Sequence, residues 1–376
     1  MHSTNMSDIK LAMARRLRST PYTSRIEKQG LTSYTIYNRM KLPAGFKDSL
    51  IDSYYHLKSD VQAWCVSAER QVKIEGQDAF QLVQLMTCRD LSNSKDKRCY
   101  YAPLIDSQAR LINDPVILRI SKNEFWLSIA DSDVLLWAKG LAIGKNYKVT
   151  VSEPDINILA IQGPKSLLLM EKVFGKKIAE LKFFGFDYFE FNGVKHLIAR
   201  SGWSKQSKYG YEIYCKGNEG LELYDHFFDI GKEYNIKPGC PHLIERIESG
   251  LLSYGNDFDD SNNPLEVDLF HKFINLDTEV EFLGKDKLKK IKAEGVSQKL
   301  MGIKINHDQI NVSDAIEITI NSKRVGELRS GCFSPTFSKV IGTAMINKPF
   351  FETGTQVEIV IDNEIKTGVL CNLPFV

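Results

Sequence analysis

The residues best suited to bind a small ligand gather in one stretch, ARSGWSKQSKYGYEIYC, which spans residues 199–215. Trp203, Tyr209 and Tyr211 stand around a polar loop, and a lone glutamate, Glu212, follows them in an alternating strand. The face of an aromatic ring attracts a cation by about 0.5–2 kcal/mol and can also stack on a flat heterocycle. A carboxylate can accept two parallel hydrogen bonds from an amino-pyrimidine edge. The stretch predicts a pocket for a flat or cationic ligand. Aromatic cover of a hairpin and a solvated glutamate are the alternatives that need no ligand.

Polar groups also interrupt two other strand patterns. Asn113 and Asp114 precede Pro115, which cannot donate to a strand ladder, so we expect this segment at a sheet edge or bulge. The polar pair could point into a cleft there, and a simple turn is the alternative. Ser128 is a hydroxyl in the apolar segment WLSIAD, where a hydrogen-bonded core hydroxyl is the alternative to a ligand contact.

Several other classes of chemistry find no support. The sequence has no nucleophile elbow, P-loop, GxGxxG or HExxH motif, and its 7 histidines do not pair at metal-ligand spacing. A net charge of +2 without a basic, aromatic-laced stripe argues against a nucleic-acid partner. The cysteines form no CxxC pair, which indicates a reducing compartment and disfavours a structural zinc site. They are Cys65, Cys88, Cys99, Cys215, Cys240, Cys332 and Cys371.

The composition is that of a globular protein. The chain has 376 residues, of which 43% are hydrophobic and 26% charged, so roughly two or three domains are expected. The sequence has no apolar run of about 18 residues, so we expect no membrane-spanning helix. The arginine-containing first 25 residues lack the apolar region of a secretory signal. An N-terminal arm and a cytoplasmic location are expected, with a mitochondrial presequence as the alternative.

The hydrophobic pattern changes character along the chain. Helical periodicity falls at residues 48–60, 76–90, 131–144, 221–234 and 241–252, with strand patterns between them. After Gly284, six short alternating runs follow one another, which is typical of a β-barrel or sandwich. The runs are LMGIKI, AIEITI, KRVGELRS, KVIGTAMI, TQVEIVI and KTGVLC. We therefore predict an α+β part, a boundary near residue 290 and a β part.

In chain order, many strings resemble the folate-binding aminomethyltransferase family, the T-protein of glycine cleavage and its relatives. They include LAIQGPKS, RSGWSKQSKYGYEIY, IERIESGLLSYGND, NPLEVDL and VGELRSGCFSPT, and the resemblance runs from about Tyr34 to Val376. It implies an α+β fold, a three-domain cloverleaf around a central folate channel. The implied domains are 1–59 with 148–238, 60–147 with 239–290, and a C-terminal β-barrel over 291–376.

A second set of strings is similar to the subgroup of this family that demethylates dimethylsulfoniopropionate. It includes TPYTSRIEKQG, FWLSIADSDVLLWAKGLAIG and PGCPHLIERIESGLLSYGND. The likeness implies direct displacement of a methyl group from the sulfonium to N5 of tetrahydrofolate, with no metal or cobalamin. Such a reaction needs in-line approach of the two partners in a dry pocket. The expected partners are the sulfonium and the folate, without nucleic acid or membrane, and a homodimer is left open.

The resemblance also implies roles for individual residues. Trp203 and Tyr211 are expected to hold the substrate cation, and Glu212 the pterin edge. Asn113 and Asp114 are expected to contact N5 or N10 of folate or to help the proton leave after transfer. A structural role is the alternative for Arg246 and Tyr254, and a solvated side chain for Lys205. The expected sets are Trp203, Tyr211, Asp114 and Asn113 for catalysis; Trp203, Tyr211, Tyr101, Ser128 and Lys205 for the substrate; and Glu212, Tyr101, Ser128, Asn113, Arg246 and Tyr254 for folate.

Three departures separate this chain from the T-protein pattern. Asn113 replaces the first of two adjacent aspartates, residues 201–205 replace a threonine-glycine-tyrosine-threonine-glycine loop, and residues 65–69 replace an Asp-x-Ser-His-Met segment. The lost carboxylate argues against aminomethyl transfer. That activity, demethylation of another methylated onium, and folate binding without catalysis are the alternatives.

Overall fold

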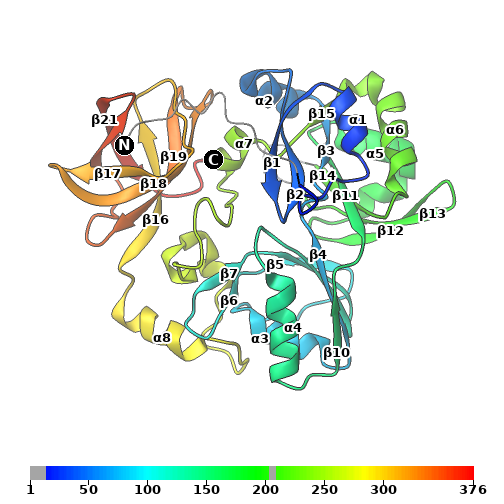
Figure 1. Ribbon diagram of the computed structural model, residues 1–376, viewed down its shortest axis with the longest axis horizontal. Coiled ribbons are helices and arrows are strands. Elements are labelled where there is room, and N and C mark those ends of the chain that lie inside the picture. The colour runs from blue at the N-terminus through cyan, green and yellow to red at the C-terminus, as the bar shows by residue number, and fades with distance from the viewer. Residues whose placement is uncertain (1–13, 203–208) are drawn as a thin grey trace.

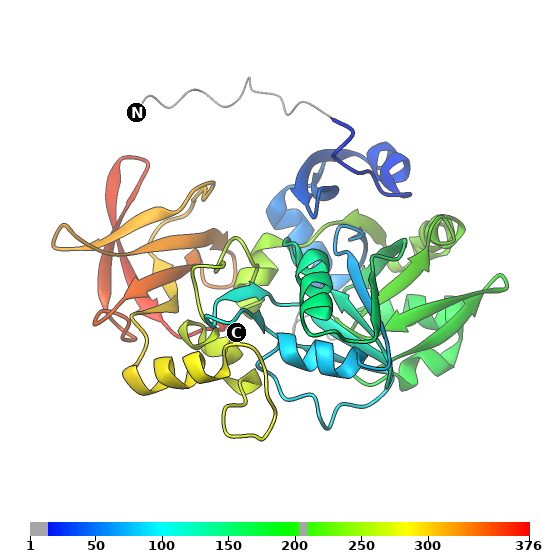
Figure 2. The ribbon, with the colours of Figure 1, turned by 60° about the horizontal axis from the view of Figure 1, so that its bottom comes forward.

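The computed structural model describes residues 14–202 and 209–376 and has three lobes around a common centre (Figure 1). Two lobes are α+β and the third is a closed barrel, which confirms the predicted cloverleaf class. Figure 2 shows the barrel, at the left of the view, set apart from the two sheet-containing lobes. In the described parts of the chain, no helix is long and apolar enough to cross a membrane.

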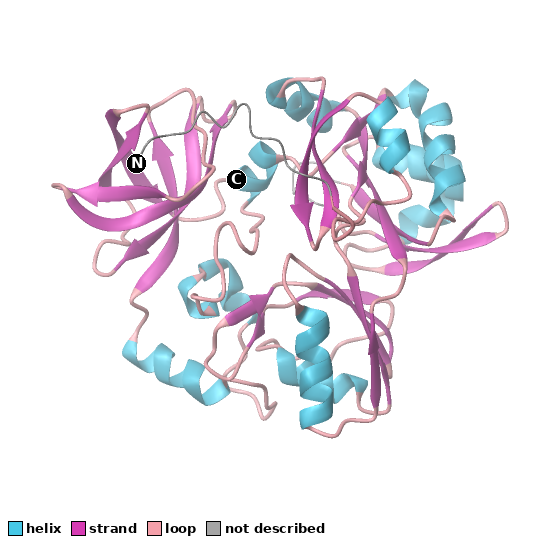
Figure 3. Ribbon diagram, in the orientation of Figure 1, coloured by secondary structure: helices cyan, strands magenta, loops and turns pink. Residues whose placement is uncertain are grey.

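The first lobe is built on a six-stranded sheet in the order β12-β13-β14-β11-β3-β15. Its central strand β11 is buried at every residue and reads INILAIQ, as expected for a strand covered on both faces. Helices α5 and α6 cover one face (Figure 3). The elements of this lobe are α1 (Thr23–Lys28), β1 (Leu31–Tyr37), β2 (Met40–Phe46), α2 (Leu50–Ser59), β3 (Val61–Cys65), β11 (Ile156–Gln162), α5 (Ser166–Phe174), η2 (Lys176–Glu180), β12 (Phe186–Phe191), β13 (Val194–Ala199), β14 (Gly210–Lys216), α6 (Gly220–Ile230), η3 (Gly231–Tyr234) and β15 (Ile236–Gly239).

The second lobe holds a five-stranded sheet in the order β10-β4-β9-β8-β5, together with a short β6-β7 pair. Apolar residues of α3 and α4 pack on one face of the larger sheet. The elements are β4 (Gln71–Gly76), α3 (Ala79–Met86), β5 (Arg98–Tyr101), β6 (Leu104–Ile105), β7 (Leu111–Asn113), β8 (Val116–Ser121), β9 (Glu124–Ser128), α4 (Val134–Gly144), β10 (Val149–Ser152), η4 (Pro264–Glu266), η5 (Asp268–Phe273) and α8 (Lys285–Glu294). Helix α7 (Leu243–Ser249) packs instead against α2 and the barrel.

The third lobe is a closed barrel in the order β16-β19-β18-β17-β20-β21. All six alternating runs of the sequence form its strands, because a period of two places one apolar set inside the barrel. The strands are β16 (Gln298–Ile305), β17 (Ile316–Ile320), β18 (Lys323–Ser334), β19 (Lys339–Asn347), β20 (Gln356–Ile361) and β21 (Glu364–Cys371).

Strand pairing bears on the predicted limits of the two interleaved domains. The bounds 60–147 and 148–238 would assign β3 to the second domain and β10 to the first. Backbone pairing instead places β3 between β11 and β15, and β10 beside β4. We therefore propose that the chain crosses between the domains within residues 66–70 and 153–155.

The two sheets meet through a shared apolar layer. Trp64, Ala160 and Tyr214 of the six-stranded sheet pack in one cluster with Leu118 and Trp126 of the five-stranded sheet. The rings of Trp126 and Tyr214 lie 6.4 Å apart. This layer fixes the face of β14 that looks toward the second lobe.

Helix α7 joins the barrel to the first lobe. Its Glu248 is fully buried and accepts hydrogen bonds from Tyr54 Oη of α2 at 2.7 Å and Ser334 Oγ of β18 at 2.5 Å. Lys58 Nζ lies 3.3 Å from the same carboxylate. Burial of a charge is costly unless it is paired, so these contacts tie three segments of the chain to one carboxylate.

Candidate functional site

Glu212 lies in the middle of β14, on the face that packs toward the second lobe. Its neighbours across the sheet are Ala160 of β11 and Ala199 of β13. Directly opposed residues share one face of a sheet, and two alanines leave space beside the longer glutamate. The local sequence therefore opens a position for a carboxylate inside an otherwise apolar layer.

Two hydroxyl groups hold the Glu212 carboxylate. Ser201 Oγ donates to Oε2 at 2.7 Å, and Tyr214 Oη donates to the same oxygen at 3.2 Å. Burial raises the pKa of Glu212, while these two hydrogen bonds act in the opposite direction. The carboxyl is therefore oriented from one side and can accept further donors from a ligand.

Asp114 is the second carboxyl of the site. It is 8% exposed, and its Oδ2 accepts a hydrogen bond from Tyr101 Oη of β5 at 2.6 Å. Burial raises the pKa of Asp114 to about 7; the Tyr101 hydrogen bond lowers it, and the charge of Asp257 raises it. Tyr101 and Asp114, both predicted site residues, thus form one unit that can exchange a proton near neutral pH.

Asn113 has a different task from the one predicted. Its Nδ2 donates to Ala130 O at 3.0 Å and Ser132 Oγ at 2.7 Å, and its Oδ1 accepts from the backbone N–H groups of Asp114 and Ala130, both at 3.0 Å. An amide side chain has two N–H donors and two acceptor positions, and all four are used here. We therefore assign Asn113 to fixing the loop after β9 rather than to contacting N5 or N10 of folate.

A third carboxyl, Glu69, was missed in the sequence analysis. It lies in the turn between β3 and β4 and is partly exposed. Burial, together with the charges of Glu212 and Asp114, raises the pKa of Glu69 to about 8. The only sequence signal was its place in residues 65–69, which differ from the T-protein pattern, since nothing local connects it to residues far along the chain.

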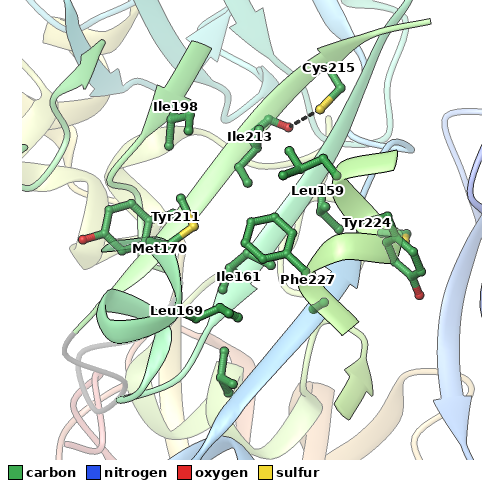
Figure 4. Packing of buried hydrophobic residues seen from close by; sticks show 14 of the residues in the cluster. Leu159, Ile161, Leu169, Met170, Ile198, Tyr211, Ile213, Cys215, Tyr224 and Phe227 are labelled. Carbon is green, nitrogen blue, oxygen red and sulfur yellow. Dashed lines mark hydrogen bonds between the residues drawn. The ribbon is translucent and has the colours of Figure 1, made fainter. Parts of the chain in front are cut away.

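Tyr211 is on the wrong face of β14 for this cluster. It is 0% exposed and packs with Met170 and Ile161 in the core beneath α5 and α6 (Figure 4). Successive residues of a strand point to opposite faces, so Tyr211 and Glu212 cannot share a pocket. We assign Tyr211 to the hydrophobic core and not to the substrate contact that was expected.

The remaining aromatic residues of the opening stretch have different placements. Tyr209 is partly buried, and the guanidinium of Arg200 lies over its ring at 4.8 Å, so one ring face meets a cation of the protein itself. Trp203 and Lys205 lie outside the described residues, and their expected contacts with the substrate stay predictions.

Ser128 and Arg246 have partners within the protein. Ser128 Oγ accepts from Gln71 Nε2 at 2.9 Å, and Arg246 Nη1 donates to Asp257 Oδ2 at 2.5 Å. Asp257 also accepts hydrogen bonds from Ser330 and Thr343 of the barrel. This pattern favours the structural alternative for Arg246, while Ser128, which is 8% exposed, keeps a place at the end of β9.

Tyr254 is influenced by the charges of nearby aspartates. Burial raises the pKa of Tyr254 to about 12, with contributions from the charges of Asp260, Asp259 and Asp114. Its ring meets that of Phe258 edge-on at 5.7 Å. The charges of three aspartates, Asp114 among them, therefore act on the Tyr254 hydroxyl group.

The three carboxyls form the chemical centre of the site. Within residues 14–202 and 209–376, no group of three or more His, Cys, Asp or Glu side chains is arranged to hold a metal ion. Interior carboxylates can accept N–H donors of a heterocycle, exchange a proton, and stabilise a cation. A pterin edge at Glu212 fits the donor set because its carboxylate is positioned by two hydroxyl groups.

Comparison with known proteins agrees with this architecture. The glycine cleavage T-protein N-terminal domain matches residues 22–278, and the glycine cleavage T-protein C-terminal barrel domain matches residues 298–376. An aminomethyltransferase T of the glycine cleavage system from Bartonella henselae has the same fold, with a TM-score of 0.85 at 20% sequence identity over 96% of this chain and 98% of that one.

Two relatives have similarity along most of their length. The dimethylsulfoniopropionate demethylase DmdA of Ruegeria pomeroyi is 39% identical over 92% of this chain and 94% of its own. The aminomethyltransferase of Thermoanaerobacter pseudethanolicus is 30% identical over 86% of this chain and 88% of its own. Both domain matches and both relatives lead to one conclusion: the chain belongs to the glycine cleavage T-protein family.

Proposed function

We propose that this enzyme transfers a methyl group from dimethylsulfoniopropionate to N5 of tetrahydrofolate, giving methylthiopropionate and 5-methyltetrahydrofolate. The similarity to DmdA carries the proposal, since it is 39% identical to this chain against 30% for the aminomethyltransferase of Thermoanaerobacter pseudethanolicus. A sulfonium is a permanent cation and a good leaving group. Direct displacement therefore requires no nucleophile from the protein.

Glu212 and the Tyr101–Asp114 pair would have different roles in the reaction. Glu212, held by Ser201 and Tyr214, would accept the N–H donors of the pterin edge. The Tyr101–Asp114 pair would lie near the reacting nitrogen, where a group with a pKa of about 7 can take up a proton. Positioning of the two reactants can lower the barrier by up to about 7–11 kcal/mol, and it is the main contribution expected of the protein.

The substrate side of the pocket rests on Trp203 and Lys205. The aromatic face of Trp203 would hold the sulfonium, and Lys205 would meet the carboxylate of the substrate. Neither contact involves a described residue. The proposal would therefore lose its account of cation recognition if Trp203→Ala turned over the substrate with an unchanged KM.

The setting of the reaction is part of the proposal. Tetrahydrofolate would serve as methyl acceptor without a metal or cobalamin, in the cytoplasm, and without a nucleic-acid or membrane partner. A homodimer is compatible with the proposal and is not needed for the chemistry.

The direct test mixes the purified protein with tetrahydrofolate and dimethylsulfoniopropionate and follows both products by NMR. Stoichiometric appearance of methylthiopropionate and 5-methyltetrahydrofolate is expected. Glycine betaine is the matched control, because a quaternary ammonium is a poorer leaving group at similar charge. Folate binding without either product would overturn the demethylase proposal and leave another donor or a binding role.

A further inference from the structure

Strand β10 forms an open edge of the five-stranded sheet. Among the described residues it pairs with β4 alone, and no isolated backbone bridge covers its other side. The strand reads VTVS, without a charge or a proline, and Thr150 is exposed. An edge strand presents backbone N–H and C=O groups that can pair with another strand. Figure 1 shows β10 at the outer margin of the second lobe.

The other edges of the two large sheets carry features that oppose such pairing. β12 contains Asp187 and Glu190, and β15 contains Lys237 and Pro238. Charged side chains and proline are common means of preventing edge-to-edge pairing. The far edge of the five-stranded sheet, β5, is covered, because its backbone donates a hydrogen bond to Phe184 O at 2.8 Å. Of these four edges, β10 is thus the one that no charge, proline or described segment protects.

Helix α4 lies beside this open edge and exposes apolar side chains. It contacts β10, whereas α3 contacts β4 and β9, so α4 is the helix nearer the edge. Leu136 and Ile143 of α4 are 62% and 82% exposed, and a spacing of seven residues puts them on one face of the helix. A strand of four residues can form only a few hydrogen bonds, so a stable partner needs apolar area as well. The exposed face of α4 supplies that area next to the strand.

We infer that β10 and α4 form the interface of a homodimer, in which β10 pairs with β10 of a second copy and each α4 flanks the joined sheet. A twofold axis makes the two strands antiparallel, so the first end of one lies beside the last end of the other. Lys145 and Lys148 precede β10, and Glu153 and Asp155 follow it. The pairing therefore places lysines near carboxylates at both ends of the strand pair, and this charge complementarity favours a second copy as the occupant.

The contact closes on itself. A twofold interface uses the same surface of both copies, and the joined sheet ends on either side at β5, which is covered. A closed pair is therefore expected, and not a growing fibre. The inference is independent of the proposed function, because Glu212 and Asp114 lie on neither β10 nor α4.

Sedimentation equilibrium of the full chain, from sub-micromolar concentrations upward, tests the association. The wild type is expected to be a dimer. Thr150→Lys combined with Ile143→Glu adds charge to the strand and the helix and should raise the dimer Kd by at least about a hundredfold. Thr35→Lys combined with Ile365→Glu changes exposed residues of the same types on β1 and β21 and should dimerise as the wild type does. Both double variants should keep the far-UV circular dichroism of the wild type.

A cross-link tests the location of the interface without weakening it. A twofold axis through so short a strand brings residue 150 close to its own copy, so Thr150→Cys should form a covalent dimer on mild oxidation, and Thr35→Cys should not. A wild type that stays monomeric at every concentration would overturn the inference. A dimer that survives Thr150→Lys with Ile143→Glu, or a dimeric Thr150→Cys protein that does not cross-link, would place the interface elsewhere and overturn it too.

Discussion

Replacing Glu69 by glutamine, which cannot ionise, should increase the free energy of unfolding of the ligand-free protein, and the increase should grow with pH. The folded-state pKa of Glu69 is about 8, against an ordinary value of 4.5, because of burial and the charges of Glu212 and Asp114. A raised pKa means that the folded state binds more protons than the unfolded state between these values. The associated stability is complete below the unfolded pKa and is lost as pH rises through the folded pKa.

The magnitude follows from the size of the pKa shift. Each unit corresponds to about 1.4 kcal/mol, which gives an upper bound of about 4–5 kcal/mol for ionising Glu69 in the fold. The side chain is partly exposed, and solvent screening reduces the expected effect to about 2 kcal/mol. Glu69→Gln has the shape of the neutral acid and cannot ionise, so it escapes this loss.

Urea unfolding of the ligand-free protein at pH 4 and pH 8.5 measures the effect. Glu69→Gln should match the wild type at pH 4, below the unfolded pKa, and exceed its free energy of unfolding by about 2 kcal/mol at pH 8.5. Glu190→Gln serves as the matched control, since Glu190 is exposed on β12. An equal stability of Glu69→Gln and wild type at both pH values would refute the reasoning that burial and the charges of Glu212 and Asp114 raise the pKa of Glu69.

Three further substitutions test the structure elsewhere. Glu248→Ala should lower the free energy of unfolding by about 3–5 kcal/mol, because it removes the buried acceptor that joins α2, α7 and the barrel. Tyr101→Phe removes a hydrogen bond that lowers the pKa of Asp114, so the acid limb of the kcat/KM profile should move to higher pH. Asn113→Asp sets a carboxylate against a carbonyl oxygen and should reduce the free energy of unfolding by about 2–3 kcal/mol, as seen in thermal melts.

Matched controls keep these outcomes interpretable. Glu352→Ala and Asn123→Asp change exposed residues of the same types and should alter the free energy of unfolding by less than about 0.5 kcal/mol. An unchanged stability in Glu248→Ala or Asn113→Asp would show that the described hydrogen bonds do not form in solution. An unchanged acid limb in Tyr101→Phe would show that Asp114 does not govern the pH profile.

The barrel could be predicted because its signal is local. Each of the six alternating runs carries its own period of two, and each became a strand of the closed sheet. The limits of the interleaved domains had no such signal. β3 and β4 are neighbours in sequence, and only pairing with distant strands shows that they belong to different sheets.

The candidate site was also predictable only where the signal is local in the sequence. Glu212 could be proposed because its type and its aromatic neighbours stand together in the sequence. The error at Tyr211 came from treating those neighbours as one group, although alternation along β14 sends them to opposite faces. Glu69 could not be found locally, since its chemistry comes from Asp114 and Glu212, which only the folded chain brings near it.

The electrostatics of the cluster also bear on the choice of substrate. The charges of Glu212 and Asp114 raise the pKa of Glu69 and, among the described residues, no cation acts on it in the opposite direction, so the site favours a positively charged ligand. That preference alone does not separate a sulfonium from a protonated amine. The leaving group does, because the sulfonium sulfur departs neutral with its electron pair. This chain also has Asn113 where the T-protein pattern has an aspartate. All four hydrogen bonds of Asn113 are formed within the protein, so its side chain does not replace the missing aspartate of the T-protein pattern. The carboxyls of Glu212, Asp114 and Glu69 are then the groups that can interact with a charge that moves from sulfur to nitrogen.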